Sequence, residues 1–420
     1  MIRQKLGGWG MSSEWAEVRL EGITSTLGDG LHGTPEYDDH GDYHFINGNN
    51  LSNGRLIVNE KTRRVSESEF LKYRKNLNDR TILVSINGTL GNVALYRGEK
   101  VILGKSACYF NVREDIDKHF VRYVLESDVF QNYIHNLATG STIKNVSLRL
   151  MRDFSFRIPS LVEQEQISSI LVALDDRIAL LRETNATLEA IAQALFKSWF
   201  VDFDPVHAKQ QGIAPEGLDE ATAALFPDSF EESALGLVPR GWRVSNFGDC
   251  INRLSVGKKY DQKTASQEGD VPILDQGKSG IIGFHNDVPG VVATLDDPVV
   301  VFANHTCYMR LITFPFSAIQ NVLPFKGKGV DTVWVYYATK ERVKFSEYKG
   351  HWPDFSIEKT IMPDTKLTMI FRDTVDPLIR QIRFNELQSQ TLATLRDTLL
   401  PRLISGQLRL PEAEALLEEV

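Results

Sequence analysis

The sequence predicts an α+β protein in which one structural unit occurs twice. Each unit has an irregular domain with a curved, mainly antiparallel sheet, followed by a long helix. The two helices are expected to form an antiparallel coiled coil about a pseudo-twofold axis. Three observations predict this fold class: the chain matches itself after a shift of 204 positions, both helices carry a heptad, and short β-type runs fill the domains.

The composition is typical of a globular protein with more than one hydrophobic core: 420 residues, 42% hydrophobic and 24% charged. No apolar run approaches the roughly 18 residues that cross a bilayer. The segment "MIRQKLGGWGMSSEW" has no apolar stretch of a secretory signal, so we expect a cytoplasmic protein, with Met11 as an alternative start and residues 1–13 as an extension. Cys108, Cys250 and Cys307 lie far apart, which argues against a disulfide framework and against a zinc site.

The net charge of −8 is distributed unevenly along the chain. Residues 216–232 contain six acids and no base, and the C-terminal "PEAEALLEEV" adds four acids. Residues 53–80, in contrast, contain eight Lys and Arg against four Asp and Glu. Basic faces are therefore possible outside the acidic segments, which permits DNA binding without demonstrating it.

The first domain, residues 1–158, contains β-type runs such as "TILVSINGTLGNVALY" and one helical pattern, "DKHFVRYVLESDVFQNYIHNL". A central helix over residues 159–201 follows Pro159, because its apolar residues recur at alternating steps of four and three. The predicted seam contains Leu171, Leu174, Ile178, Leu181, Asn185 and Leu188.

The second half repeats this order after an acidic linker, residues 202–239. The second domain spans 240–362, with runs such as "PVVVFANHTCYMRLITF", and the second helix spans 363–406, before an acidic tail, 407–420. Its seam contains Leu378, Ile382, Asn385 and Leu392, and Pro401 is expected to kink or end the helix. Asn185 and Asn385 lie in mid-seam, where a buried amide fixes register at some cost in stability.

Motifs that would indicate catalysis do not meet their structural requirements. "GDGLHG" (28–33) has the spacing of a dinucleotide fingerprint, but Thr34-Pro35 follows at once and no helix opens there. "LGKSA" and "DQGKSG" lack the first glycine of a phosphate-binding loop. The sequence has neither a Pro-Pro-aromatic methyltransferase motif nor a correctly ordered nuclease motif. Asp202, Asp204 and His207 are better explained as a solvated helix exit than as a metal site, so we expect no metal ligands and no cofactor in this chain.

Several phrases resemble the specificity subunit of type I restriction-modification systems. "LEAIAQALFKSWFVDFDPV" is similar to that family's central conserved region, and "TLATLRDTLLPRLISGQL" to its C-terminal one. "DGLHGTPEY", "HFINGNNL" and "ILVSINGTLGNVALY" resemble the body of a target-recognition domain, and "HWPDFSIEKTIMP" resembles the exit of another. The similarity covers nearly the whole chain, and the conserved-region phrases are its more specific part.

The resemblance implies a non-catalytic subunit that binds double-stranded DNA. Each target-recognition domain would read one half of a gapped, bipartite sequence, and the paired helices would set the gap. The helices would also dock two modification subunits that hold S-adenosylmethionine and methylate adenine, and restriction subunits would join that complex. Two alternatives stay open: a nuclease or methyltransferase with diverged motifs, and a coiled-coil scaffold that does not bind DNA.

Polar and basic residues in loops are the candidate DNA contacts, because carboxamides, hydroxyls and cations read base edges or bind phosphates. In the first domain these are Gly30, His32, Gly33, Thr34, Arg63, Arg64, Lys72, Arg74, Lys75, Ser85, Asn87 and Thr89. In the second they are Lys258, Lys259, Gln276, Lys278, Asn304, His305 and Thr306. "DQGKSG" and "FANHTC" replace the "SINGT" phrase of the first domain, so the two domains should read different half-sites.

Trp199, Phe200, Phe203, Leu395 and Leu399, near the helix ends, are candidates for contact with the modification subunits. Exposed aromatic side chains at a helix end suit a protein interface. The alternative is that these side chains close the core between each helix and its domain.

Overall fold

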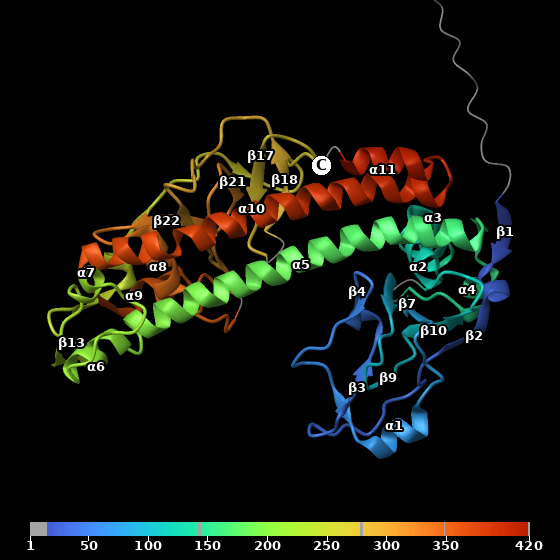
Figure 1. Cartoon of the computed structure of the whole chain (residues 1–420), viewed down its shortest axis with the longest axis horizontal. Coiled ribbons are helices and arrows are strands. Elements are labelled where there is room, and N and C mark those ends of the chain that lie inside the picture. The colour runs from blue at the N-terminus through green and yellow to red at the C-terminus, as the bar shows by residue number, and fades with distance from the viewer. Residues whose placement is uncertain (1–14, 141–143, 278–279, 348, 419–420) are drawn as a thin grey trace, which may run out of the picture. The chain divides into compact units, whose positions relative to one another are not determined.

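The computed structural model of the chain describes residues 15–140, 144–277, 280–347 and 349–418. It contains two compact units. Unit 1 comprises Met1–Ala179 and Ser389–Val420, and unit 2 comprises Leu180–Gln388. The helices α5 (Leu161–Phe200) and α10 (Thr365–Ile404) are each divided between the two units, with one segment in unit 1 and the other in unit 2 (Figure 1).

The main sheet of unit 1 is antiparallel, in the order β2-β10-β7-β8. Its strands are β2 (Thr24–Asp29), β10 (Ala107–Val112), β7 (Thr81–Asn87) and β8 (Thr89–Leu95). Residues 81–86 are all buried, as expected for a β-branched run that is covered on both faces. The covering helices are α2 (Lys118–Glu126), α3 (Asp128–Leu137) and α4 (Leu148–Asp153).

A smaller sheet completes the first domain, in the order β6-β3-β9. It contains β6 (Arg64–Val65), β3 (Tyr43–Ile46) and β9 (Val101–Leu103), with α1 (Glu67–Tyr73) after β6. The short pair β4 (Leu51–Ser52) and β5 (Arg55–Leu56) packs against β8 of the main sheet. The ends of the domain pair as an antiparallel ladder between β1 (Ala16–Arg19) and β11 (Ser155–Ile158). The first and last strands of the domain therefore lie side by side, and the last one leads directly into α5.

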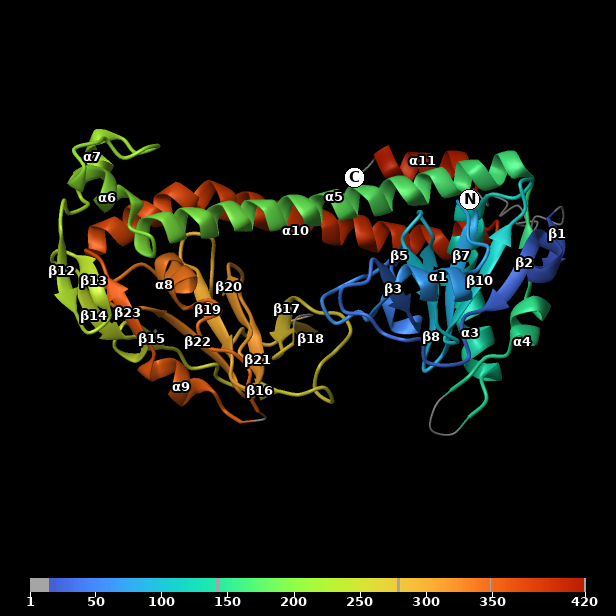
Figure 2. The same cartoon turned by 90° about the horizontal axis from the view of Figure 1, so that it is seen from below.

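Unit 2 repeats this architecture. Its main sheet has the order β15-β22-β19-β20, with strands β15 (Ile251–Arg253), β22 (Val322–Gly327), β19 (Val299–Ala303) and β20 (Met309–Ile312). Figure 2 shows α8 (Thr332–Thr339) against β19, β20 and β22. The second sheet contains β16 (Lys259–Tyr260), β21 (Ser317–Ile319), β17 (Val271–Leu274) and β18 (Ile281–His285).

The predicted repeat is confirmed at the level of single elements. α10 begins and ends 204 positions after α5, and the same shift converts α4 and β11 into α9 (Trp352–Ile357) and β23 (Lys359–Met362). β23 pairs with β14 (Arg243–Asn246) as β11 pairs with β1. The fold class is therefore as predicted: two α+β domains with mainly antiparallel sheets, each followed by a long helix.

The two long helices are antiparallel within each unit. In unit 2, Asn385 donates from Nδ2 to Asn185 Oδ1 at 2.8 Å, and Asn185 Nδ2 donates to the carbonyl of Ile382 at 3.1 Å. Further along, the ring of Phe371 lies 5.6 Å from that of Phe196, so the contact positions ascend on α5 as they descend on α10. In unit 1, Leu171 and Leu174 share a core with Leu392, Leu399 and Leu403.

The remaining seam residues differ in how deeply they are buried. Ile178 and Leu181 are buried, whereas Leu188, Leu378 and Ile382 are half-buried. Ile379, the neighbour of Leu378, is buried in the core of unit 2. An α-helix that also packs on a globular domain buries a wider face than a two-residue seam, so neighbouring positions share the contact.

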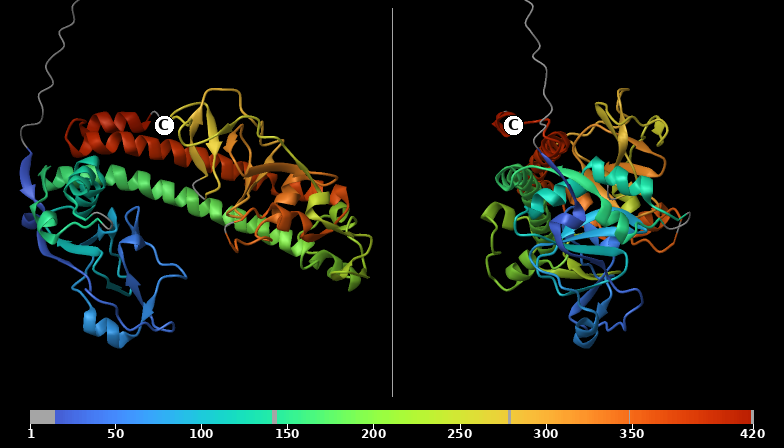
Figure 3. Two further views of the ribbon diagram at one scale, coloured as in Figure 1. Left: turned by 180° about the vertical axis from the view of Figure 1, so that it is seen from behind. Right: turned by 90° about the vertical axis from the view of Figure 1, so that its right-hand side faces the viewer.

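Two predictions about the segments beside the long helices were too simple. The expected linker is folded, because residues 202–239 contain α6 (Asp204–Gln210), α7 (Glu220–Ala223) and the hairpin of β12 (Phe230–Ser233) and β13 (Gly236–Pro239). α10 continues through Pro401 to Ile404, close to the predicted end at residue 406, so Pro401 does not end the helix. The acidic tail contains α11 (Leu410–Glu418), which lies beside the end of α10 in Figure 3 and packs Ala413 into the core of unit 1.

No helix among the described residues is long and apolar enough to cross a membrane.

Candidate DNA interface

The polar surface of unit 1 is formed by loops that converge at one end of its sheets. The loop after β2 lies against the turn between β9 and β10, because the amide of Leu31 donates to the carbonyl of Leu103 at 2.6 Å. That turn contacts the loop after β3 through Ser106, whose Oγ accepts from the amide of Gly48 at 2.9 Å. The amide of Ile86 in β7 also donates to the carbonyl of Ser106 at 2.9 Å. Segments from four parts of the sequence therefore share one surface.

The predicted residues in these loops divide into exposed and buried ones. His32, Gly33, Thr34 and Thr89 are exposed, and His32 Nε2 lies 2.6 Å from the carboxylate of Asp29. Asn87 is half-buried at the tip of the β7–β8 hairpin, where its Nδ2 donates to Asn145 Oδ1 at 3.0 Å. These side chains remain candidates for contact with DNA.

The prediction that Gly30 and Ser85 contact DNA is wrong, because neither residue is accessible. A Cβ at Gly30 would lie 2.1 Å from the carbonyl oxygen of Leu103, so this glycine permits close strand packing. Ser85 is fully buried, and its Oγ accepts from the amide of Asn92 at 2.8 Å across the hairpin. Both residues shape the loops and cannot touch a ligand in this conformation. Their turn-like sequence context suggested exposure, and the close packing of neighbouring chain segments on both residues contradicts it.

The basic candidates of unit 1 lie along β6 and α1. Arg63, Arg64 and Arg74 are exposed, and Lys75 is half-buried. The guanidinium of Arg63 lies 5.5 Å from the ring centre of Tyr37. A chain segment connects this region to the loop after β2, since the amide of Asp38 donates to the carbonyl of Arg64 at 3.0 Å.

Lys72 is already engaged within its own helix. Hydrogen bonds to Tyr73 and to Glu69, whose carboxylate is 3.4 Å away, raise the pKa of Lys72 above its ordinary value. Lys105 was not predicted, although it is exposed at the centre of the converging loops. The Gly-Lys-Ser turn between two apolar runs is the signal in the sequence that would have identified it.

In unit 2 the structure brings most of the predicted loop residues together. Gln276 Oε1 accepts from the amide of His305 at 3.0 Å, and the hydroxyl of Thr306 donates to the carbonyl of Gln276 at 2.5 Å. Asn304 Oδ1 accepts from the amide of Trp352 at 2.8 Å. Gln276 and Asn304 therefore hold the shape of this surface, whereas Thr306 is exposed on it. Lys278 lies outside the described residues.

The two adjacent lysines of unit 2 have different surroundings. Lys258 Nζ lies 2.7 Å from Asp287 Oδ2, and this hydrogen bond raises the pKa of Lys258 and lowers that of Asp287. Lys259 instead lines an open groove together with Arg253. A pattern of two consecutive lysines cannot distinguish these environments, since neighbouring side chains point in different directions.

Each domain is anchored to the long-helix segments of its own unit by a carboxylate. In unit 1, Asp175 accepts from Arg122 at 2.6 Å, from the hydroxyl of Tyr123 at 2.8 Å and from Arg396 at 2.8 Å. Burial alone would raise the pKa of Asp175, but these partners outweigh burial, and its pKa is lower than usual. Glu126, beside Arg122 at 3.0 Å, is buried enough that its pKa is raised.

In unit 2 the anchoring carboxylate is Glu189. It accepts from the hydroxyls of Tyr337 at 3.0 Å and Tyr336 at 3.3 Å, and from Lys340 at 2.5 Å. Burial alone would raise the pKa of Glu189. The hydrogen bonds that Glu189 accepts, above all the one from Lys340, outweigh burial, so its pKa is lower than usual. Both carboxylates are therefore ionised anchors.

The proposed partner-binding side chains at the helix ends are mostly buried, so that prediction is wrong for three of them. Trp199, Phe200 and Leu399 are at most 5% exposed. The first two belong to the core of unit 2 and Leu399 to that of unit 1. Phe203 and Leu395 are half-buried and pack against the same cores. These apolar side chains close the junction of helix and domain, which was the alternative explanation.

No group of three or more His, Cys, Asp or Glu side chains suited to a metal ion occurs in the part of the chain that the structure describes.

The fold and the surface define a class of protein: a pair of similar α+β domains, each presenting polar loops of a kind that reads nucleic acid, joined by long helices. Comparison with known proteins gives a family that the chain resembles. Residues 12–190 match the family model described as a type I restriction modification DNA specificity domain. The chain is thus similar to the specificity subunits of type I restriction-modification systems.

The chain is also similar in sequence to two curated relatives and similar in fold to one solved structure. The chain is 24% identical to the type I restriction enzyme MjaIX specificity subunit of Methanocaldococcus jannaschii, over 86% of this chain and 84% of the relative. It is 26% identical to the HindI specificity subunit of Haemophilus influenzae, over 69% and 77%. The crystal structure of a type I S subunit from M. genitalium has a similar fold, with a TM-score of 0.53, 20% identity and coverage of 95% and 98%.

Proposed function

We propose that each α+β domain reads one half of a gapped, bipartite DNA sequence. The observation that carries this proposal is the repeat itself, in which one arrangement of strands and polar loops occurs twice. The last strands of the two copies, β11 and β23, lie 204 positions apart. The loop residues differ between the two copies, with Asn87 and Thr89 in one and Thr306 in the other. Two similar scaffolds with different loops suit two different half-sites.

The pair formed by α5 and α10 sets the distance between the half-sites in this proposal. A 40-residue helix is about 60 Å long, comparable to two turns of DNA. Asn185 and Asn385 support a fixed register, because Asn385 can donate to Asn185, and Asn185 to the carbonyl of Ile382, only when the helices are aligned.

The partners in this proposal are two methyltransferase subunits that hold S-adenosylmethionine, with restriction subunits joining the complex in the cytoplasm. The exposed apolar side chains of the long helices support a protein interface. Leu180 and Ile191 on α5 are 52% and 44% exposed, and Phe384 and Leu387 on α10 are 60% and 46% exposed. They take the place of the buried helix-end residues as candidate contacts.

Methylation mapping tests the proposal directly. The full chain is co-expressed with its cognate modification subunit in a host without other adenine methylation, and modified adenines are mapped by single-molecule sequencing. We expect one gapped motif that appears only when both proteins are present. A soluble complex that methylates no motif, or one continuous motif, would contradict the proposed division into two half-sites.

A further inference from the structure

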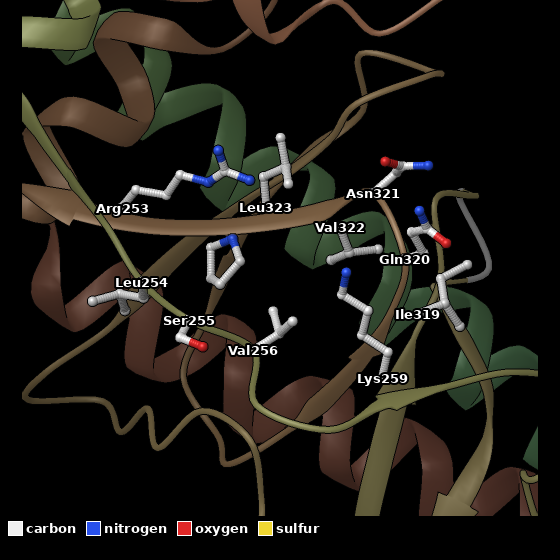
Figure 4. Close-up of a pocket in the computed structure, with 11 residues that line it drawn as sticks. Arg253, Leu254, Ser255, Val256, Lys259, Ile319, Gln320, Asn321, Val322 and Leu323 are labelled. Atoms are coloured by element: carbon white, nitrogen blue, oxygen red, sulfur yellow. The ribbon is translucent and has the colours of Figure 1, made fainter.

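A groove in unit 2 has the composition of a DNA-contact site beyond the predicted loops. It lies between the segment that connects β15 to β16 and the turn that connects β21 to β22 (Figure 4), with a volume of about 510 Å³. Its lining includes Arg253, Ser255, Lys259, Gln320 and Asn321. None of the lining residues that the structure describes is acidic, although the whole chain carries a net charge of −8.

The two cations of the groove are not neutralised by a carboxylate among the described residues. Arg253 lies with its guanidinium carbon 5.1 Å from the ring centre of Trp352, which orients the side chain and leaves its donors available. Lys259 is exposed on β16, whereas its neighbour Lys258 is paired with Asp287. Two unpaired cations in an acid-free groove favour an anionic ligand.

The two carboxamides of the groove occupy the turn between β21 and β22. Asn321 has φ = 68°, in the left-handed region that asparagine tolerates, and its carbonyl accepts from the amide of Asn304 at 2.9 Å. This bond places the turn beside the predicted loop that contains Asn304 and Thr306. No described residue hydrogen-bonds the side chains of Gln320 or Asn321, so both amides are available to read a base edge.

We propose that this groove is part of the surface that contacts the DNA of the second half-site. Arg253 and Lys259 contact backbone phosphates, and Gln320 and Asn321 contribute to base specificity. Phosphate contacts supply affinity and salt dependence, while carboxamides pair with adenine edges. The inference rests on the proposed function, since it assigns residues within the second recognition domain.

The phosphate contacts are tested with the full chain bound to its modification subunit, on duplex DNA that carries the mapped motif. The double substitution Arg253→Gln with Lys259→Gln is expected to weaken binding at least 10-fold and to lower the slope of log K against log salt by about two. Lys328→Gln with Lys366→Gln is the matched control, because both lysines are exposed in unit 2 and lie outside the groove and the predicted loops. It removes equal charge and should leave the slope nearly unchanged. Lys259→Gln alone avoids the Arg253–Trp352 contact and should lower the slope by about one.

The base contacts are tested by mapping the motif of a variant with Gln320→Ala and Asn321→Gly, where glycine tolerates the positive φ. We expect the second half-site to become degenerate at one or more positions, with about 10-fold lost discrimination, and the first half-site to stay unchanged. An unaltered motif together with an unaltered salt slope would overturn the inference while the proposed function stands. If the wild-type complex has no bipartite motif, the proposed function itself fails.

Discussion

The two domains attach to their long helices by different chemistry, although they occupy equivalent places in the repeat. The first uses an ionic network around Asp175, and the second uses packed aromatic rings together with Glu189. The helices that make these contacts, α2 and α8, correspond closely. Each begins with an aspartate cap, Asp117 or Asp331, whose amide donates to a polar side chain of a long helix.

Aligning those caps shows what changed between the copies. Tyr123 and Tyr337 are equivalent, and each donates its hydroxyl to a carboxylate. Arg122 and Glu126, however, correspond to Tyr336 and Lys340. Asp175 is replaced by Ile379 after the shift of 204, and the second carboxylate comes from another position, Glu189. The comparison teaches that the repeat preserves a tyrosine–carboxylate anchor while the residues around it are free to differ.

The largest expected change in stability comes from the cluster of aromatic rings around Phe371 in unit 2. Phe371 is fully buried and its ring contacts those of Phe196, Trp199, Phe200 and Tyr337. Phe371→Ala should lower the free energy of unfolding by about 4 kcal/mol, because it leaves a cavity in a packed cluster. Phe384→Ala, the same change at a 60% exposed site of the same helix, is the control and should cost less than about 1 kcal/mol in urea denaturation. Equal losses would contradict the anchoring role.

The ionic anchor of unit 1 should be the next most sensitive. Asp175→Leu leaves Arg122 and Arg396 without their shared partner, which should cost about 3 kcal/mol. The exposed neighbour Asp176→Leu is the matched control. If both substitutions change the denaturation midpoint equally, the network contributes nothing specific.

Glu189 is expected to matter less than Asp175, since its aromatic surroundings remain after substitution. Glu189→Gln keeps the shape and the tyrosine hydrogen bonds but loses the charge opposite Lys340, for about 1 kcal/mol. Adding Lys340→Met should recover part of that loss, which a double-mutant cycle measures. Strict additivity would show that the two side chains do not interact.

The smallest expected effect is that of pH on the stability contributed by Asp175 and Glu189, because this contribution changes only under acidic conditions. The pKa values of Asp175 and Glu189 are lowered in the folded state, so their stabilising contribution is complete above the ordinary carboxyl pKa near 4. It is lost as the pH falls below that value and through the folded-state pKa. The difference in unfolding free energy between the wild type and Asp175→Asn should therefore be constant from pH 7 to 5 and shrink below pH 4. A difference that shrinks already at neutral pH would exclude this carboxylate as its source.

The polar loop surfaces of the two domains could be predicted from the sequence only in part. Turn composition correctly placed the loops around Thr34, Asn87 and Thr306 at exposed or half-buried positions. It could not separate Ser85, buried inside β7, from Asn87 two positions later on the same face of the strand, since the loop around Gly48 packs against Ser85 and the hairpin tip leaves Asn87 half-buried. It also missed Lys105, Arg253 and Gln320, because the surroundings of these residues are formed by loops that are far apart in the sequence.

The sequence by itself determined the repeat, the bounds of α5 and α10 within about two residues, and the seam asparagines, because helical periodicity and a constant offset are local properties of the chain. Only the tertiary structure decided that Trp199 and Phe200 close a core, that Lys258 is paired while Lys259 lines a groove, and that Asp175 joins two arginines from different halves of the sequence. Burial and charge pairing depend on contacts between residues far apart in the chain, and no local pattern specifies those contacts.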